Sequence, residues 1–421
     1  MLDPFRLETC GGCYDPQKKN KPKELASSYR PISLLSIIGK LFERIFLKRL
    51  MPMVDERKIL PRHQFGFRKR HSTIEQVHRT TDLIERCFEN KLICSVALLD
   101  ISQAFDRVFL EGLAFKLLKL LPINYYLLLT SYLSGRSFRV RHEDTYSAFA
   151  PILAGVPQGS VLGPVLFLIY MSDLPRSRGI RTSTYADDTG LAAIGEDPRC
   201  VGALLQRGLD RTSKFCKRWR TALNGTKSQH ATFSLKKNSY FPVKIDDEVV
   251  PPVDAANHLG VWLDTRLTFG HHVRVKSSQI KKKYRSMWWL FKPTNGLSLK
   301  NKLLLYSSIL KPIWTYGCQL WGCAASSNIR RIQTVQSSIL RGILGVRWDD
   351  YVRNDVIHRL LGVPTVVETI QKHSLRYAHR LSTHPNLSAY NLINRYNVGL
   401  RRLKRRKPFD CVSEDITDLI N

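Results

Sequence analysis

The feature that most constrains the fold is a pair of adjacent aspartates in a short turn. Residues 182–190 read Thr-Ser-Thr-Tyr-Ala-Asp-Asp-Thr-Gly, and the small apolar run Leu191–Ile194 follows. We expect a tight β-turn between two short strands, because Asp side chains bond to nearby backbone groups and tolerate unusual φ angles. Two interpretations stay open here. The turn is either a solvated hairpin tip or, because carboxylate oxygens are Mg²⁺ ligands, one part of a metal site that also takes substrate phosphates.

A third carboxylate determines how the chain must fold if the metal interpretation holds. Asp100 follows a compact apolar run, residues 92–99, which has the length of a buried strand. If this strand lies beside the Asp187–Asp188 hairpin, three carboxylates converge and repel one another unless cations lie between them. Two Mg²⁺ ions about 3.5–4 Å apart are the usual clamp for phosphoryl transfer in polymerases and nucleases. The plainer alternative for Asp100 is a strand-terminal or helix-capping aspartate.

The charge balance of the chain favours a polyanionic partner. Its 66 Lys and Arg against 35 Asp and Glu give a net charge of +31 over 421 residues. Such a field attracts nucleic acid first and an anionic membrane surface second. No apolar run reaches the roughly 18–20 residues that span a bilayer, and the N-terminus lacks the apolar core of a signal peptide. We therefore expect an intracellular protein without a membrane partner.

The basic residues are unevenly distributed. Between Asp264 and Asp349 there is no acidic residue, against fifteen Lys and Arg. Helical periodicity over 273–291, 297–314 and 329–344 predicts a separate helical subdomain that faces a polyanion; the alternative is a solvated basic surface without a particular partner. Residues 401–407, RRLKRRK, form a basic tail that either touches nucleic acid or acts as a nuclear address.

Other residues near these carboxylates have chemistry that suits a nucleotide. Phe105 follows Asp100 by five residues, and its ring is of a size to pack against a sugar and exclude a 2′-hydroxyl. Gln158 and Gly159 lie in a Pro- and Gly-containing loop that allows close backbone approach. Lys227 can meet a triphosphate or protonate a leaving pyrophosphate. Each has a plainer alternative: a core Phe, an ordinary loop and a solvated Lys.

Taken together, these segments resemble the reverse transcriptases of non-LTR (LINE-type) retrotransposons of the jockey kind. The resemblance rests on seven blocks in order: SYRPISLLSIIGKLFERI, QFGFRKRHST, ALLDISQAFDRV, GVPQGSVLGPVLFLIYMSDLP, YADDT, LNGTKS and HLGVWLD. It implies an α+β right-hand polymerase with fingers, an antiparallel palm sheet and a helical thumb. The expected divisions are a poorly ordered N-terminal remnant, fingers and palm, a basic helical thumb with C-terminal extension, and a basic tail, over residues 1–28, 29–264, 265–400 and 401–421.

The resemblance also implies roles for individual residues. Asp100, Asp187 and Asp188 fall on the family's metal-binding catalytic positions, and Phe105 falls on its sugar-gate position. The remaining matches are Gln158 and Gly159 in the template- and nucleotide-contacting loop, Lys227 at the motif D lysine, and Arg68 in the fingers block that faces the triphosphate or template.

The implied function is an RNA-directed DNA polymerase that extends a primer 3′-hydroxyl on an RNA template with dNTPs and two Mg²⁺ ions, with Mn²⁺ as a substitute. Two alternatives stay open: a catalytically silent nucleic-acid-binding fragment of a decayed element, and an RNA-directed RNA polymerase, against which Phe105 and the Tyr185–Ala186 pair argue. Family members carry an endonuclease domain before the polymerase, so we expect that activity from a missing N-terminal domain or in trans. We expect the protein to be in the nucleus at least transiently.

Overall fold

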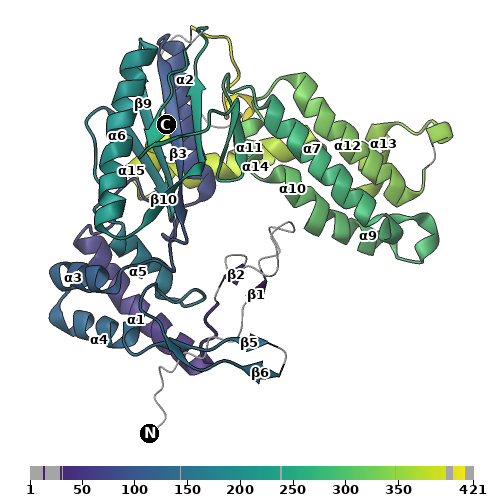
Figure 1. Cartoon of the computed structure of the whole chain (residues 1–421). Helices are drawn as coiled ribbons and strands as arrows, with labels where there is room; N and C mark the ends of the chain where they lie inside the picture. Colours follow the sequence, from purple (N-terminus) through teal and green to yellow (C-terminus); the bar gives the residue numbers. More distant parts are fainter. Residues whose placement is uncertain are drawn as a thin grey trace.

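The computed structural model describes residues 13–14, 29–30, 32–142, 144–237, 239–346, 348–394 and 402–412. A central sheet separates a group of helices near the N-terminus from a long helical arm formed later in the chain (Figure 1). In the described ranges, every helix is too short or too polar to cross a bilayer.

The central sheet is four-stranded and antiparallel, with the order β10-β3-β9-β8. Its strands are β3 (Ile93–Ser102), β8 (Ile180–Tyr185), β9 (Asp188–Gly195) and β10 (Ala222–Phe233). Side chains alternate between the faces of a strand. Cys94 and Val96 of β3 share a core with helix α2 (Thr73–Glu89), whereas Ala97 and Leu99 pack with α6 (Pro198–Arg218). The two helices therefore cover opposite faces of the sheet.

Two elements around β10 differ from the expected boundaries. The apolar pattern of residues 201–223 predicts a helix that continues to Leu223, but α6 ends at Arg218. A strand is predicted to begin at Ala231, but β10 begins at Ala222. The reason is that β10 pairs with β3 on both sides of a bulge between Asn224 and Gln229. A bulge interrupts the two-residue alternation, so the pattern of apolar residues does not reveal that the strand is continuous.

The helices near the N-terminus form a second group around a core of their own. Its helices are α1 (Ile37–Glu56), α3 (Leu110–Leu120), α4 (Ile123–Leu133) and α5 (Gly163–Tyr170). The apolar positions of residues 34–50 predict a helix from Leu34. Helix α1 begins at Ile37 instead, because Ser36 caps it by accepting a hydrogen bond from Gly39 N–H at 3.0 Å. Short strand pairs lie beside these helices, namely β1 (Cys13–Tyr14) with β2 (Tyr29–Arg30), β4 (Ser137–Phe138) with β7 (Ala150–Pro151), and β5 (Arg141–His142) with β6 (Thr145–Tyr146).

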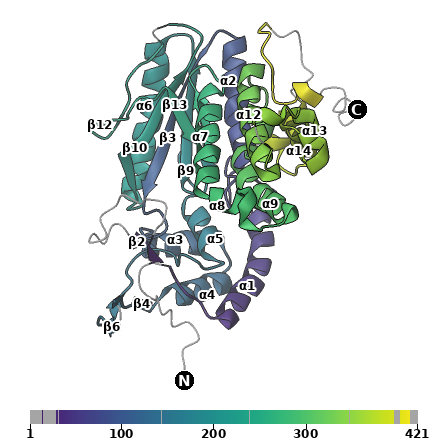
Figure 2. The same cartoon turned by 90° about the vertical axis from the view of Figure 1, so that its right-hand side faces the viewer.

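The helical arm follows two further strand pairs, β11 (Lys244–Ile245) with β12 (Glu248–Val249) and β13 (Ala255–His258) with β14 (Val261–Asp264). Figure 2 shows the arm beside the sheet. The three helices expected here are present, but two are interrupted: one divides at Met287, and another contains a π-helical turn, Tyr306–Leu310, just before Pro312. The arm comprises α7 (Gly270–Ser286), α8 (Trp288–Phe291), α9 (Leu299–Leu305), α10 (Lys311–Thr315), α11 (Cys318–Trp321), α12 (Ser326–Leu344) and α13 (Asn354–Leu361).

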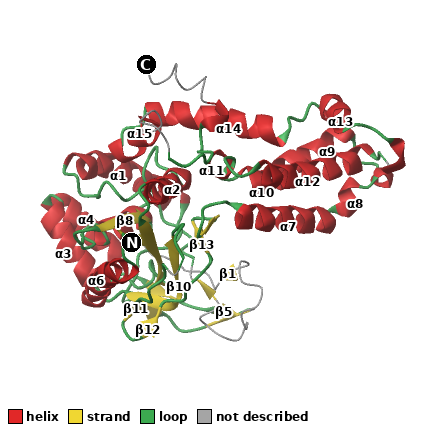
Figure 3. Ribbon diagram, turned by 90° about the horizontal axis from the view of Figure 1, so that it is seen from above, coloured by secondary structure: helices red, strands yellow, loops and turns green. Residues whose placement is uncertain are grey.

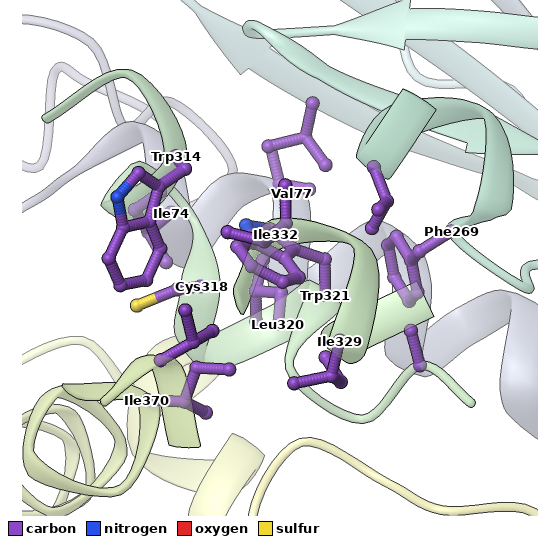
Figure 4. Close-up of a cluster of buried hydrophobic side chains, with 14 of the residues drawn as sticks. Ile74, Val77, Phe269, Trp314, Cys318, Leu320, Trp321, Ile329, Ile332 and Ile370 are labelled. Carbon is purple, nitrogen blue, oxygen red and sulfur yellow. The ribbon is translucent and has the colours of Figure 1, made fainter. Parts of the chain in front are cut away.

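The last helices return from the arm to the palm. Helix α14 (Val366–Ser382) extends from the arm to α15 (Leu387–Asn394), which packs on α2 (Figure 3). One continuous hydrophobic core joins α2, the arm and α14, with Trp314 and Trp321 buried between Ile74 and Ile370 (Figure 4). The expected boundary after residue 264 is therefore not a gap in the packing.

The basic tail is partly docked on this same core. Arg402 Nε donates to Glu89 O at 2.8 Å, and Arg405 Nη2 donates to Leu267 O at 3.0 Å. The Arg405 guanidinium lies 5.2 Å from the centre of the Phe88 ring. Two of the tail's cations thus hold it against the end of α2. The expectation of a nucleic-acid contact or a nuclear address stays a prediction that rests on its other cations.

Candidate active site

The strand register brings the three aspartates to one end of the sheet. Strands β3 and β9 pair with Leu99 opposite Thr189, so the same antiparallel register continues to Asp100 and Asp188. On its other side, Asp100 pairs with Asn224 of β10. By the two-residue alternation, Asp100 projects from the same face of β3 as Cys94 and Val96. The carboxylates that lie far apart in the sequence are therefore neighbours because of the sheet topology.

The electrostatics of Asp188 reflect this crowding. Burial, together with the negative charges of Asp187 and Asp100, raises the pKa of its carboxyl group to about 6. The residue is nonetheless exposed at the surface, so water offsets part of the burial effect. The two neighbouring charges are the contribution that a bound cation cancels directly.

The donor set fits a divalent ion, but it is not a preassembled cage. Among the residues that the structure describes, no group of three or more His, Cys, Asp and Glu side chains is gathered as a metal ion would hold them. Mg²⁺ keeps several waters and is usually bound by one or two carboxylates together with substrate phosphates. Adjacent carboxylates with a third on the next strand can serve as such ligands, and the charges of Asp187 and Asp100 contribute, after burial, to the raised pKa of Asp188.

The turn that carries the aspartates is held by a residue that the sequence motifs did not single out. Tyr185 pairs with Asp188, which leaves Ala186 and Asp187 at the tip, and Ala186 has a φ of 56°. Gln64 Oε1 accepts hydrogen bonds from Ala186 N–H at 3.0 Å and from Gly66 N–H at 2.8 Å. Gln64 Nε2 lies 3.4 Å from Ala186 O, to which it donates. Gln64 opens the block QFGFRKRHST, but no pattern in the sequence assigns it a role.

Phe105 lies beside this centre in an aromatic cluster. Its ring stacks on Phe167 with centroids 4.7 Å apart and meets the edge of Phe67 at 6.1 Å. The residue is partly buried, so one portion of the ring stays open to solvent. Its carbonyl accepts a hydrogen bond from Val156 N–H at 2.8 Å. The gate position is thus rigid, while its contact with a sugar stays a prediction.

Gln158 and Gly159 lie between the segment before α1 and the loop that follows β3. Gln158 Nε2 donates to Asp106 Oδ1 at 2.7 Å, and Gln158 O accepts from Ser33 N–H at 2.7 Å. Gly159 has a φ of 96°, and a Cβ there would lie 3.0 Å from Ser33 O. These contacts position the loop next to Phe105. The expected contact with template or nucleotide stays a prediction.

Lys227 lies in the β10 bulge, next to Asp100 in the sheet. Its side chain is exposed, and its backbone N–H donates to Asn224 Oδ1 at 3.0 Å. The adjacent Ser228 Oγ accepts from Asp100 N–H at 3.1 Å and donates to Asn224 O at 2.7 Å. The bulge therefore holds the exposed Lys227 side chain on a segment of β10 that is hydrogen-bonded to β3 at Asp100.

Arg68 has a different environment from the one expected of a triphosphate ligand. Its Nη1 donates to Pro61 O at 3.3 Å and Gln64 O at 3.4 Å, and its Nη2 lies 3.8 Å from Asp55 Oδ1. Burial lowers the pKa of the guanidinium, and the Asp55 charge offsets part of this effect. In this conformation Arg68 supports the loop that carries Gln64, and its phosphate role stays a prediction.

Comparison with known proteins identifies the family. The profile described as "Reverse transcriptase (RNA-dependent DNA polymerase)" matches residues 17–266. The chain belongs to the reverse transcriptase family. It is 41% identical over 401 residues to "Probable RNA-directed DNA polymerase from transposon X-element" of Drosophila melanogaster, a match that covers 94% of this chain and 44% of that protein.

Other relatives place the chain within this family. It is 37% identical over 408 residues to the "RNA-directed DNA polymerase from mobile element jockey" of Drosophila melanogaster, covering 93% of this chain and 44% of that protein. The expected resemblance to jockey-like non-LTR elements is thereby confirmed. The chain thus spans less than half the length of these relatives. Among solved structures, it is similar to a Candida albicans telomerase in complex with a telomeric RNA fragment, with 13% identity, a TM-score of 0.41, and coverage of 94% of this chain and 67% of that one.

Proposed function

We propose that this chain is an RNA-directed DNA polymerase that extends a primer 3′-hydroxyl on an RNA template with dNTPs. The observation that carries the proposal is the pairing of Leu99 with Thr189, which places Asp100 and Asp188 at the same end of two adjacent strands, in a member of the reverse transcriptase family. An isolated Asp pair on a hairpin has many structural uses. A third carboxylate on the adjacent central strand, whose charge raises the pKa of Asp188, is the arrangement that two-metal phosphoryl transfer requires.

The roles of the side chains follow from their places around this edge. Asp100, Asp187 and Asp188 would hold the divalent ions on which this family depends. When bound, these ions supply charge neutralisation at the reacting phosphate and activation of the attacking hydroxyl. Phe105 restricts the space beside the sugar, and Lys227 offers an ammonium group to the triphosphate side. Nucleic acid is gripped by the acid-free helices of the arm through phosphate contacts.

Insertion of a DNA copy requires a nick that this site does not make. We infer that the endonuclease comes from another part of a longer protein or from a second protein. Because the target is chromosomal DNA, the protein acts in the nucleus at least transiently.

Primer extension by the purified chain tests the proposed activity. We expect Mg²⁺-dependent extension of a DNA primer on an RNA template with dNTPs, and loss of extension by at least about 10³-fold in Asp187→Asn, since charge-stabilising groups at such a centre are each worth this order. The control is Asp210→Asn, which removes an exposed carboxylate of α6, the helix that covers the opposite face of the sheet from Asp100.

Three outcomes separate the proposal from its alternatives. Preferential use of rNTPs would instead indicate an RNA-directed RNA polymerase. RNA binding without any extension, unaffected by Asp187→Asn, would indicate a silent nucleic-acid-binding fragment. Equal extension by the wild type and Asp187→Asn would show that the carboxylates are not the catalytic centre.

A further inference from the structure

The two-residue tip of the carboxylate hairpin contains a non-glycine residue in a left-handed backbone conformation. Only Ala186 and Asp187 lie between the paired residues Tyr185 and Asp188. Ala186 has a φ of 56°, in the left-handed region where a residue with a Cβ is strained. A strained tip persists only where its surroundings over-determine it. Because Asp187 and Asp188 come directly after Ala186, any relaxation of this tip moves the carboxylates.

One side chain satisfies both backbone polar groups of Ala186. Gln64 Oε1 accepts from Ala186 N–H at 3.0 Å, and Gln64 Nε2 donates to Ala186 O at 3.4 Å. Gln64 and Ala186 are 4% and 7% exposed, so water does not replace these bonds if they are lost. An amide is the one neutral side-chain group that offers an acceptor and a donor in this geometry.

The backbone on either side of Gln64 is bonded to the same strand. Phe65 N–H donates to Thr184 O at 3.0 Å, and Thr184 N–H donates to His63 O at 3.2 Å. Gly66 then turns against the tip so closely that a Cβ on it would lie 2.1 Å from Ala186 N. The close approach allows Gln64 Oε1 to accept from Gly66 N–H as well, at 2.8 Å, which fixes the amide orientation.

The loop that carries Gln64 is also held from the C-terminal side. Asn386 Nδ2 donates to Arg62 O at 3.1 Å, and His384 Nε2 donates to Arg70 O at 2.7 Å. His384 and Asn386 lie in the connection between α14 and α15. The residues that they contact, Arg62 and Arg70, lie on either side of Gln64 in the sequence. The segment that carries Gln64 is therefore held by hydrogen bonds to the α14–α15 connection, and Gln64 in turn is hydrogen-bonded to the hairpin tip.

We propose that Gln64 is a positioning residue of the catalytic centre: its amide holds the Ala186 peptide and thereby fixes Asp187 and Asp188 for metal binding and phosphoryl transfer. The inference rests on the proposed polymerase function. It assigns Gln64 no contact with substrate, so loss of its amide should lower kcat and weaken the response to metal while leaving template binding intact.

The test compares two substitutions with a matched control. Gln64→Met keeps the volume and removes all three hydrogen bonds, and Gln64→Glu keeps the acceptor for the two N–H groups but cannot donate to Ala186 O. The control is Gln336→Met, which removes another buried amide, one that donates to Tyr306 Oη at 3.1 Å and Pro364 O at 3.0 Å within the arm. If Gln336→Met lowers Tm as much as Gln64→Met does, a difference in kcat between the two variants is not caused by the loss of stability.

We expect kcat of Gln64→Met to fall by about 10²-fold, because a misplacement of about 1 Å has that effect. The dNTP KM and the RNA–DNA affinity should change by less than about threefold, the Mg²⁺ concentration for half-maximal rate should rise, and Gln64→Glu should recover part of kcat. Gln336→Met should keep kcat. An active wild type with an unchanged kcat in Gln64→Met would overturn the inference, as would a loss equal to that of the control.

A second measurement does not depend on activity. Amide hydrogen exchange in a peptide covering residues 182–190 should be faster in Gln64→Met than in the wild type, and unchanged in Gln336→Met. Unchanged exchange in Gln64→Met would overturn the proposed clamp even if the wild type were inactive, whereas an inactive wild type with faster exchange in Gln64→Met would contradict the polymerase function alone.

Discussion

At the scale of single residues, Phe105 is the side chain that we propose as the sugar gate. Its ring packs against Phe167 and Phe67, and the residue is only partly buried. We expect Phe105→Val to lower the preference for dNTPs over rNTPs by at least about tenfold, the usual effect of opening a steric pocket. Competitive single-nucleotide incorporation measures this preference.

The matched control for this substitution is Phe109→Val. Phe109 belongs to the same loop and packs against the same core, and Arg220 lies 4.0 Å over its ring. The loss of apolar volume is equal in the two variants, so a general loosening of the core would alter both. If the dNTP preference falls equally in both variants, or does not fall in Phe105→Val, Phe105 is not the sugar gate.

Asp188 links the chemistry of the site to its stability. Its pKa is raised to about 6 by burial and by the charges of Asp187 and Asp100. A carboxyl group whose pKa is raised by folding favours the folded state most when it is protonated, so its contribution is lost as pH rises through about 6. The ionised group therefore destabilises the metal-free protein at pH 8 and not below its ordinary pKa of 3.8.

Because the ionised Asp188 destabilises the metal-free protein, we expect Asp188→Asn to raise Tm at pH 8 in the presence of EDTA. The increase in Tm should become smaller as the pH falls toward 4. Mg²⁺ should raise the Tm of the wild type at pH 8 more than that of the variant, because the ion removes the same repulsion. Thermal unfolding at several pH values, with and without Mg²⁺, measures both effects. A Tm increase that does not depend on pH would contradict the electrostatic cause.

At the scale of elements, an ion pair between the buried Glu75 and the half-exposed Arg380 joins α2 to α14. Glu75 of α2 is 0% exposed, and its carboxylate accepts from Ser72 N–H at 2.8 Å and lies 3.0 Å from Arg380 of α14. Arg380→Met leaves this carboxylate without its strongest partner. We expect a loss of up to about 3–5 kcal/mol in the free energy of unfolding, the usual range for a buried charge deprived of its partner.

The half-exposed position of Arg380 places the expected loss at the lower end of that range. The control is Arg359→Met, which breaks an exposed pair with Asp355 at 3.3 Å on α13 and should change stability by less than about 0.5 kcal/mol. Urea unfolding measures both. If the two substitutions proved equivalent, the pair would not be what fastens α14 to the palm.

Elements with strong local signals could be predicted from the sequence, and long-range partners could not. The strand before Asp100, the hairpin and the arm helices follow from apolar periodicity and turn chemistry. The role of Gln64 was missed because its partner Ala186 is 122 residues away, and a lone glutamine in a basic turn has no periodic signature. The return of α14 was missed for the same reason: Arg380 meets Ser72 across 308 residues.

At the scale of the whole molecule, positive charge is concentrated on the arm. Residues 265–348 contain no acidic side chain, and α7 exposes the consecutive cations Lys281, Lys282 and Lys283. The same helix ends beside Trp288 and Trp289, which are 45% and 64% exposed. Cations meet phosphates, and exposed indole rings stack on bases, so this surface suits a nucleic acid better than a solvated face without a partner.

The salt dependence of binding distinguishes these two interpretations. Each phosphate neutralised by a lysine adds about 1 to the slope of log K against log salt concentration. Changing Lys281, Lys282 and Lys283 to Gln should therefore lower the slope for an RNA–DNA hybrid by about 1 for each lysine that contacts a phosphate. The same change at the exposed Lys236, Lys237 and Lys244 of the palm alters net charge equally without touching the arm. Affinity measured at several salt concentrations should then separate the two variants, and equal slopes in both would show that the arm acts only through the overall charge.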